Sequence, residues 1–263
     1  MATLLLKKSY LHKNLKEIKF QDLWNGYGIF TTMRVVGKSA KIIFYKSHLD
    51  NLIQSLKKYN IYKKNFKKNI LNLIKINLKK NKKYDHLLRV ASNNKIISIS
   101  LRKRPLPKLN FKLKLINYKR VDAEFKNLKY KKILGILGKL DTTKFDIGLY
   151  KNQKLLESGT SNLLFVKSNK IYSPKRDIYK GITFKFFSKK FKIKHDDIFI
   201  KKLDNYDEII LVGSGKGVVS VSEIENNPWK RKSLRIYKKL FKTYNKEIFY
   251  SWSILSSILN TSF

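Results

Sequence analysis

The 263 residues carry 59 Lys and Arg against 18 Asp and Glu, which gives a formal net charge of +41 at pH 7. Of these basic residues 51 are Lys, spread along the chain, and only 8 are Arg. Contacts to nucleic-acid bases and bidentate contacts to phosphate favour Arg, so the charge indicates a composition bias and we expect no specific nucleic-acid partner. The absence of cysteine excludes disulfides and thiolate metal sites, and no apolar run reaches the roughly 18 residues of a membrane helix, so we expect a cytoplasmic protein without a metal centre.

The first part of the chain predicts strands and helices in alternation. Residues 29–36 and 41–45 flank a tight turn and favour two strands, and the apolar spacing within 46–59 and 70–78 favours two helices. Two further strands are expected at 87–91 and 96–101. Pro105 and Pro107 then interrupt the pattern, and we place a domain boundary there, between residues 1–106 and 107–263.

The second part also mixes both element types. The strands that we expect share short apolar or alternating runs, and they cover 111–116, 147–150, 154–157, 162–166, 208–212 and 218–221. The expected helices cover 130–140, 181–191 and 229–252. Strands and helices in both parts predict a mixed α and β protein with two domains.

Four features follow one another at a suggestive spacing. Lys126 lies 31 residues before Glu157, and two small-residue turns come after them, at 181–183 and 213–217. In this order they could hold an aldehyde cofactor. The lysine would carry the Schiff base, the carboxylate would hold the ring nitrogen, and the turns would supply donors for a phosphate.

The ordered set resembles the fold-type IV pyridoxal-phosphate enzymes, which include branched-chain aminotransferases, D-amino-acid aminotransferases and 4-amino-4-deoxychorismate lyases. The resemblance runs from about residue 25 to 224, and it adds the segments 26–34, 47–52 and 207–208 to the four features above. It implies the two-domain fold-type IV fold and pyridoxal 5'-phosphate as cofactor. It also implies a homodimer with its active site at the subunit and domain interface.

The resemblance assigns roles within the cofactor site. Lys126 corresponds to the Schiff-base lysine and catalyst; Lys129 is a rival, but its spacing to Glu157 fits less well. Glu157 would keep the pyridine nitrogen protonated, which makes the ring an electron sink. The phosphate would be bound by the two turns, through Gly181, Ile182, Thr183, Gly213 and Ser214, with Lys216 adding positive charge.

One position departs from the family pattern. The family usually has a phosphate-binding Arg three residues after the histidine of the 47–52 segment, and here Asn51 stands there. Losing a charge-assisted bidentate contact weakens binding by about 1.5–3 kcal/mol unless other groups compensate. The same segment contains His48, which we interpret as a packed helix residue.

The segment 30–34, Phe-Thr-Thr-Met-Arg, bears on the reaction. It is similar to the lyase subgroup, so we assign a catalytic role to Thr31 and a substrate contact to Thr32; the alternative is that both threonines only favour a strand. The family's Arg-rich substrate loop is reduced here to 92–95, which leaves Arg89, Arg102 or Arg104 for the substrate carboxylate, and we choose Arg89.

Three functions follow from these observations. The first is a pyridoxal-phosphate lyase that converts 4-amino-4-deoxychorismate to 4-aminobenzoate and pyruvate on the folate route. The second is an aminotransferase that uses the same Lys126 and Glu157 on an amino acid and a 2-oxo acid. The third is a basic binding protein that has lost its cofactor chemistry, with Asn51 as the first sign of that loss. The lyase differs from the aminotransferase because it needs no 2-oxo acid.

Overall fold

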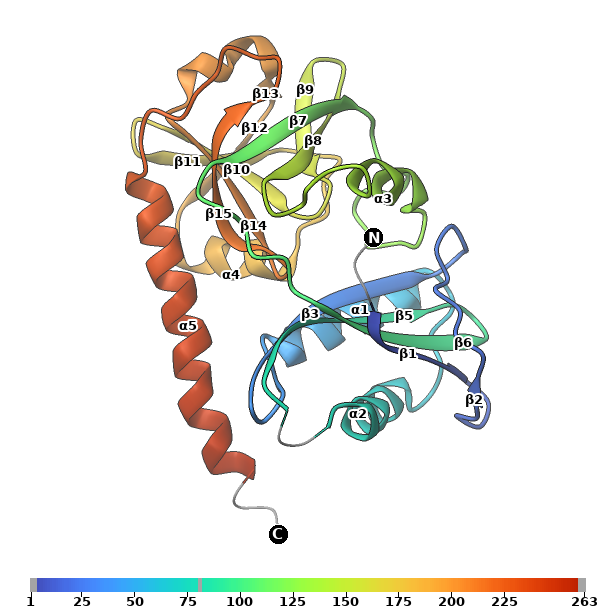
Figure 1. Ribbon diagram of the computed structural model, residues 1–263. Coiled ribbons are helices and arrows are strands. Elements are labelled where there is room, and N and C mark those ends of the chain that lie inside the picture. Colours follow the sequence, from blue (N-terminus) through green and yellow to red (C-terminus); the bar gives the residue numbers. More distant parts are fainter. Residues whose placement is uncertain (1–3, 80–81, 260–263) are drawn as a thin grey trace. The chain divides into compact units, whose positions relative to one another are not determined.

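The computed structural model describes residues 4–79 and 82–259, the last ten of them through their backbone alone. Within this part of the chain the contacts define two compact units (Figure 1). Unit 1 comprises Met1–Pro105 and Arg120–Leu140, and unit 2 comprises Leu106–Lys119 and Asp141–Phe263. The predicted mixed α and β class is confirmed, because each unit combines a sheet with helices.

Unit 1 is built on a six-stranded antiparallel sheet of order β2-β1-β6-β5-β3-β4. Its strands are β1 (Leu4–Leu11), β2 (Glu17–Ile18), β3 (Ile29–Gly37), β4 (Lys41–Ile42), β5 (Tyr84–Ser92) and β6 (Ile96–Lys103). Helices α1 (Tyr45–Lys58) and α2 (Phe66–Asn77) bury their apolar stripes against one face, where Met33, Leu52 and Leu88 belong to a single core. Alternate residues therefore point to the opposite face.

The segment Arg120–Leu140 joins unit 1 through its backbone, and it ends in α3 (Lys131–Leu137). The N–H of Phe30 donates to the carbonyl of Lys126 at 2.9 Å, and the N–H of Leu128 donates to the carbonyl of Gly28 at 3.0 Å. A Cβ on Gly28 would come within 2.4 Å of the Ser92 carbonyl oxygen, so only glycine allows this approach. By its contacts Lys126 therefore belongs to unit 1. The predicted domain boundary after residue 106 assigns it instead to the C-terminal domain, and that boundary stays a prediction.

Unit 2 contains a nine-stranded mixed sheet of order β12-β11-β10-β14-β15-β7-β8-β9-β13. Its strands are β7 (Phe111–Asn117), β8 (Phe145–Lys151), β9 (Lys154–Ser158), β10 (Asn162–Lys167), β11 (Lys170–Pro174), β12 (Ile193–Asp196), β13 (Ile198–Phe199), β14 (Glu208–Gly213) and β15 (Gly217–Ile224). Its helices are α4 (Ile182–Lys190), a 3₁₀ helix (Ile200–Asn205) and α5 (Arg235–Leu259). The strand β14 is buried on both faces, which explains its unbroken apolar run.

The last helix starts later than the sequence predicts. The sequence predicts a helix from residue 229, but Trp229 lies in the loop before α5, where its indole N–H donates to the Tyr206 carbonyl at 2.9 Å. The buried carboxylate of Glu208 accepts from the N–H groups of Ile236 and Tyr237, at 2.8 and 2.7 Å. This carboxylate satisfies N–H donors that have no partner within the helix, and it therefore fixes the start of α5 at this point of the chain. None of the described helices is both long and apolar enough to cross a membrane.

Candidate cofactor site

Glu157 lies at the end of β9, directly before a tight turn. The N–H of Ser158 donates to the carbonyl of Ser161 at 2.9 Å, and the chain then reverses into β10. Glu157 is only 5% exposed, and its carboxylate accepts from the backbone N–H of Tyr179 at 3.2 Å. A buried carboxylate is costly unless it has partners, so this position favours a role that needs a fixed negative charge.

Asn162 connects this carboxylate to the start of α4. Its amide donates to the Tyr179 carbonyl at 2.6 Å and accepts from the N–H of Gly181 at 3.0 Å. A Cβ on Gly181 would lie 3.0 Å from the amide oxygen of Asn162, which leaves little room for a larger residue. Asn162 is not among the site residues that the sequence predicts, although it ends the segment Glu-Ser-Gly-Thr-Ser-Asn that contains Glu157.

The two predicted phosphate turns meet within unit 2. The hydroxyl groups of Thr183 and Ser214 are 3.3 Å apart, at the start of α4 and in the turn between β14 and β15. The first N–H groups of a helix have no partner within it and favour an anion. The buried side chain of Ile182 has no hydrogen-bond donor, so this residue can contribute only through its backbone. A Cβ on Gly213 would lie 2.7 Å from the Ser161 hydroxyl, which shows how closely these turns pack.

Lys216 does not add free positive charge to this turn. Its ammonium group donates to the buried carboxylate of Asp146 at 3.0 Å and to the Thr160 hydroxyl at 3.1 Å. The expectation that Lys216 contributes its charge to a phosphate is therefore not favoured by its environment, since Asp146 neutralises that charge. The sequence carried no local signal for this pair, because its members are 70 residues apart.

In unit 1, Lys126 is held through its backbone while its amine lies 5.0 Å from the centre of the Phe30 ring. The loop before it is fixed by Arg120, which donates to the carbonyls of Ala123 and Phe125 at 2.6 and 2.9 Å. Lys126 is half-buried, whereas its rival Lys129 is exposed. The environment therefore distinguishes the two lysines in favour of Lys126.

Thr31 and His48 are joined on the helix-covered face of the unit 1 sheet. The Thr31 hydroxyl and Nδ1 of His48 are 2.8 Å apart, and both side chains are buried. Burial, and to a smaller extent the positive charge of Lys126, lower the pKa of His48 to about 3. His48 is therefore neutral at neutral pH and electrostatically coupled to Lys126. Asn51 lies half-buried in α1, one turn after His48.

Thr32 and Arg89 are cross-strand partners on the opposite face of the same sheet. Arg89 is 9% exposed; it donates to the Asp22 carbonyl at 2.8 Å and packs over the Trp24 ring at 4.2 Å. Its Nη1 is buried and has no hydrogen-bond partner among the described residues. Arg104, by contrast, already pairs with Asp85 through two hydrogen bonds of 2.9 and 3.2 Å.

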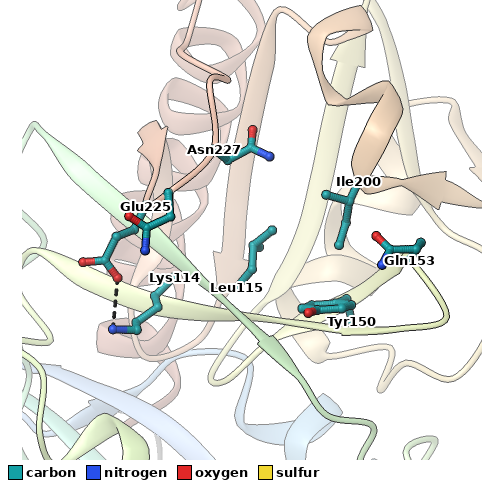
Figure 2. Close-up of a pocket in the computed structure, with 8 residues that line it drawn as sticks. Lys114, Leu115, Tyr150, Gln153, Ile200, Glu225 and Asn227 are labelled. Atoms are coloured by element: carbon teal, nitrogen blue, oxygen red, sulfur yellow. Dashed lines mark ion pairs between the residues drawn. The ribbon is translucent and has the colours of Figure 1, made fainter.

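A separate hollow of about 260 Å³ lies elsewhere in unit 2 (Figure 2). It is lined by polar side chains such as Gln153, Asn227 and the ion pair of Lys114 with Glu225. None of its lining residues belongs to the predicted cofactor site. We therefore do not assign the hollow to the cofactor.

Comparison with known proteins decides the family. The family model described as amino-transferase class IV matches residues 28–224. The chain belongs to the class IV aminotransferase family. It is accordingly a pyridoxal-phosphate-dependent enzyme, which confirms the cofactor and the enzyme class that we predicted. The alternative of a binding protein without cofactor chemistry does not agree with this family.

Solved structures of class IV enzymes share the fold. A branched-chain aminotransferase from Thermoproteus uzoniensis aligns with a TM-score of 0.71 and 17% identity, over 91% of this chain and 93% of that one. A putative 4-amino-4-deoxychorismate lyase from Legionella pneumophila gives 0.67 and 20%, over 88% and 96%. The PLP-bound form of a hypothetical aminotransferase from Mycobacterium tuberculosis gives 0.67 and 12%, over 91% and 98%. The predicted fold-type IV architecture is confirmed, and a search of curated proteins by sequence returns no match.

The donor set of unit 2 fits the cofactor. A phosphate needs several hydroxyl and N–H donors, which Thr183, Ser214 and the start of α4 offer together. A protonated ring nitrogen needs a buried carboxylate, which Glu157 offers, and Asn162 links the two groups of residues through hydrogen bonds. The cofactor residues that sequence spacing selected in this unit thus lie in one connected arrangement.

Proposed function

We propose that this class IV enzyme is a lyase that converts 4-amino-4-deoxychorismate to 4-aminobenzoate and pyruvate. The observation that carries the proposal concerns Thr31, which occupies the position where the lyase pattern has threonine. Its hydroxyl is hydrogen-bonded to His48, and His48 is electrostatically coupled to Lys126. The Coulombic effect of Lys126 on His48 indicates that the lysine charge lies near this histidine, and a threonine bonded to that histidine favours a part in proton transfer.

Each residue would have its own role in this reaction. Lys126 would hold the cofactor covalently until the substrate amine displaces it, and its free amine would then move protons to and from the substrate. When bound, pyridoxal phosphate supplies an electron sink for the charge left on the substrate. Glu157 would hold the ring nitrogen in its protonated form, and Lys126 would protonate the enol of the departing pyruvate. Thr183, Ser214, Gly213 and the backbone of 181–183 would hold the phosphate.

Arg89 and Thr32 would bind the substrate on the sheet face opposite Thr31, so Thr31 would act on it only through His48 and Lys126. An unpaired guanidinium N–H in a buried position costs free energy, and a carboxylate ligand would satisfy it. Replacing Arg89 by Met is expected to raise the KM about tenfold or more while cofactor affinity stays unchanged. Arg104→Met is the matched control, because Arg104 is already paired with Asp85.

The alternative is an aminotransferase with the same Lys126 and Glu157. It is favoured by the several structural neighbours that are branched-chain aminotransferases. In that case Arg89 would recognise the carboxylate of a 2-oxo acid. By resemblance to the family we also propose that the enzyme is a cytoplasmic homodimer. Analytical sedimentation would measure the mass of the assembly.

The deciding experiment supplies 4-amino-4-deoxychorismate without any 2-oxo acid and measures 4-aminobenzoate by fluorescence. Release of 4-aminobenzoate by the wild type and by Lys129→Ala, but not by Lys126→Ala, would support the lyase. Borohydride reduction followed by peptide mass spectrometry would show whether the cofactor is attached at Lys126. Amino-group transfer to a 2-oxo acid with no 4-aminobenzoate would overturn the lyase in favour of the aminotransferase.

A further inference from the structure

Asp146 and Lys216 form a buried ion pair that the mechanism above does not use. Their side chains are 0% and 4% exposed, and the ammonium nitrogen lies 3.0 Å from Oδ2 of Asp146. The same oxygen accepts from the hydroxyls of Ser158 and Thr160, at 3.1 and 2.7 Å. Oδ1 accepts from the N–H of Ile147 at 2.8 Å. The carboxylate is thus fully engaged, as a buried charge requires.

The pair connects the two segments that hold the cofactor groups of unit 2. Ser158 directly follows Glu157 and, with Thr160, forms the turn between β9 and β10; the Ser158 hydroxyl also accepts from the N–H of Ser161 at 2.8 Å. Lys216 lies two residues after Ser214, in the turn between β14 and β15. Lys216 therefore ties the Ser214 turn to the Glu157 turn through Asp146 and Thr160.

Energetics indicate that such a pair serves position more than stability. Moving two charges out of water costs about as much as their attraction returns, so a buried pair is often no better than apolar residues of the same volume. Its hydrogen bonds, however, allow only one arrangement of the segments that they join. A phosphate site gains when its donors are already in place before the ligand arrives.

We propose that Asp146 and Lys216 are positioning residues that set the Ser214 turn against the Glu157 turn, so that the hydroxyls of Ser214 and Thr183 are placed in advance for the cofactor phosphate. The inference rests on the proposed phosphate role of Thr183 and Ser214. Lys216 acts here through its place and not through its charge, because Asp146 neutralises that charge.

The test compares the affinities of the protein for pyridoxal phosphate and for pyridoxal, which lacks the phosphate. The ratio of the two dissociation constants reports the phosphate half of the site alone. Asp146→Asn and Lys216→Met are each expected to lower this phosphate preference about tenfold, the loss of one or two well-placed hydrogen bonds. Lys154→Met is the matched control, since it breaks another ion pair of unit 2, the 2.6 Å contact with Asp197, and should leave the preference unchanged.

The direction in which Asp146→Asn changes the phosphate preference shows whether Lys216 acts through its position or through its charge. If Lys216 bound the phosphate directly, removing the carboxylate would free its ammonium group and raise the preference. A higher preference in Asp146→Asn would therefore overturn the proposal, and a lower one supports it.

The double variant Asp146→Leu/Lys216→Met covers the case in which the single variants fold poorly. Thermal unfolding of the cofactor-free protein measures its fold, which apolar replacement is expected to restore. Restored unfolding temperature with a preference still lowered supports positioning, whereas recovery of both would mean that the pair only stabilises the fold and would overturn the proposal. If the wild type itself shows no phosphate preference, or Thr183→Val does not lower it, the proposed phosphate site fails first, and the positioning role fails with it.

Discussion

Unit 1 and unit 2 hold the residues that we propose for catalysis in different ways. In unit 2, Glu157 and Thr183 are buried, and hydrogen bonds through Asn162 link the segments that carry them. In unit 1, Lys126 is half-buried and fixed by its backbone, and its amine lies over the Phe30 ring. A group that only holds a cofactor gains from being fixed beforehand, whereas a lysine that must leave the cofactor and then move protons needs a side chain that can move.

The largest effect on turnover should come from replacing Lys126. Lys126→Ala is expected to lower the turnover rate by about 10²–10⁴-fold, the range for loss of a positioned acid–base group. The variant should still take up the cofactor non-covalently, because the phosphate donors lie in unit 2. Turnover and equilibrium dialysis with pyridoxal phosphate measure the two properties. Loss of cofactor uptake together with turnover would contradict the division between the units, and Lys129→Ala serves as the control because that lysine is exposed.

His48 allows a second test of unit 1, through pH. Burial lowers its pKa in the folded protein to about 3, whereas in the unfolded chain it is near 6.5. Between these values the unfolded chain binds a proton that the folded chain does not. Neutral His48 therefore makes its full contribution to the free energy of unfolding above about pH 6.5, and this contribution is lost as pH falls. The loss is up to about 1.4 kcal/mol per pH unit and reaches about 3 kcal/mol by pH 4.

Urea unfolding at pH 7 and pH 4.5 measures this loss. His48→Gln keeps a group that can bond the Thr31 hydroxyl but does not titrate, so its stability should fall less between the two pH values than that of the wild type. His195→Gln is the control, because His195 is exposed. An equal loss in wild type and His48→Gln would show that His48 becomes protonated without cost, and its coupling to Lys126 would then need another explanation.

The same contrast explains which parts the sequence could predict. Glu157 and the turns at 181–183 and 213–214 are recognisable because their residue types and order are local signals, and the structure gathers them in one unit. The apolar run of β14 is another local signal. Partners that are far apart in sequence gave no such signal: Glu208 sets the start of α5 from 28 residues away, and residues 126–128 pair with residues 28–30.

Arg89 shows a different limit. The register of β3 with β5 places it opposite Thr32, but the sequence could not distinguish it from Arg102 or Arg104 as a carboxylate ligand. The distinction from Arg104 depends on which guanidinium already has an acidic partner, and Asp85 supplies that partner to Arg104. Pairing of this kind is a property of the folded sheet, where residues 19 positions apart become neighbours.

Glu157 in unit 2 should give the next largest effect. Glu157→Gln removes the negative charge but keeps an oxygen that can accept from the Tyr179 N–H, so the fold should be retained. Loss of a charge-assisted hydrogen bond to the ring nitrogen corresponds to about 1.5–3 kcal/mol, or roughly 10- to 100-fold in rate. Steady-state turnover measures the rate and circular dichroism the fold.

Glu223→Gln is the control for this carboxylate, because Glu223 pairs with Lys112 at the surface and should tolerate the change. A Glu157→Gln enzyme with wild-type turnover would refute the assignment of Glu157 to the ring nitrogen. A misfolded variant would instead show that the carboxylate is needed for the turn between β9 and β10.

The smallest effect should come from the two hydroxyls, because each is one of several phosphate donors. Thr183→Val keeps the branched shape but removes the hydroxyl, and it should weaken pyridoxal phosphate binding about tenfold while leaving pyridoxal binding unchanged. Ser214→Ala should behave alike. Since the two hydroxyls lie 3.3 Å apart, the double variant should lose less than the sum of the single losses. Additive losses, measured by titration of the cofactor-free protein, would mean that the hydroxyls act separately and that unit 2 is less preorganised than its hydrogen bonds indicate.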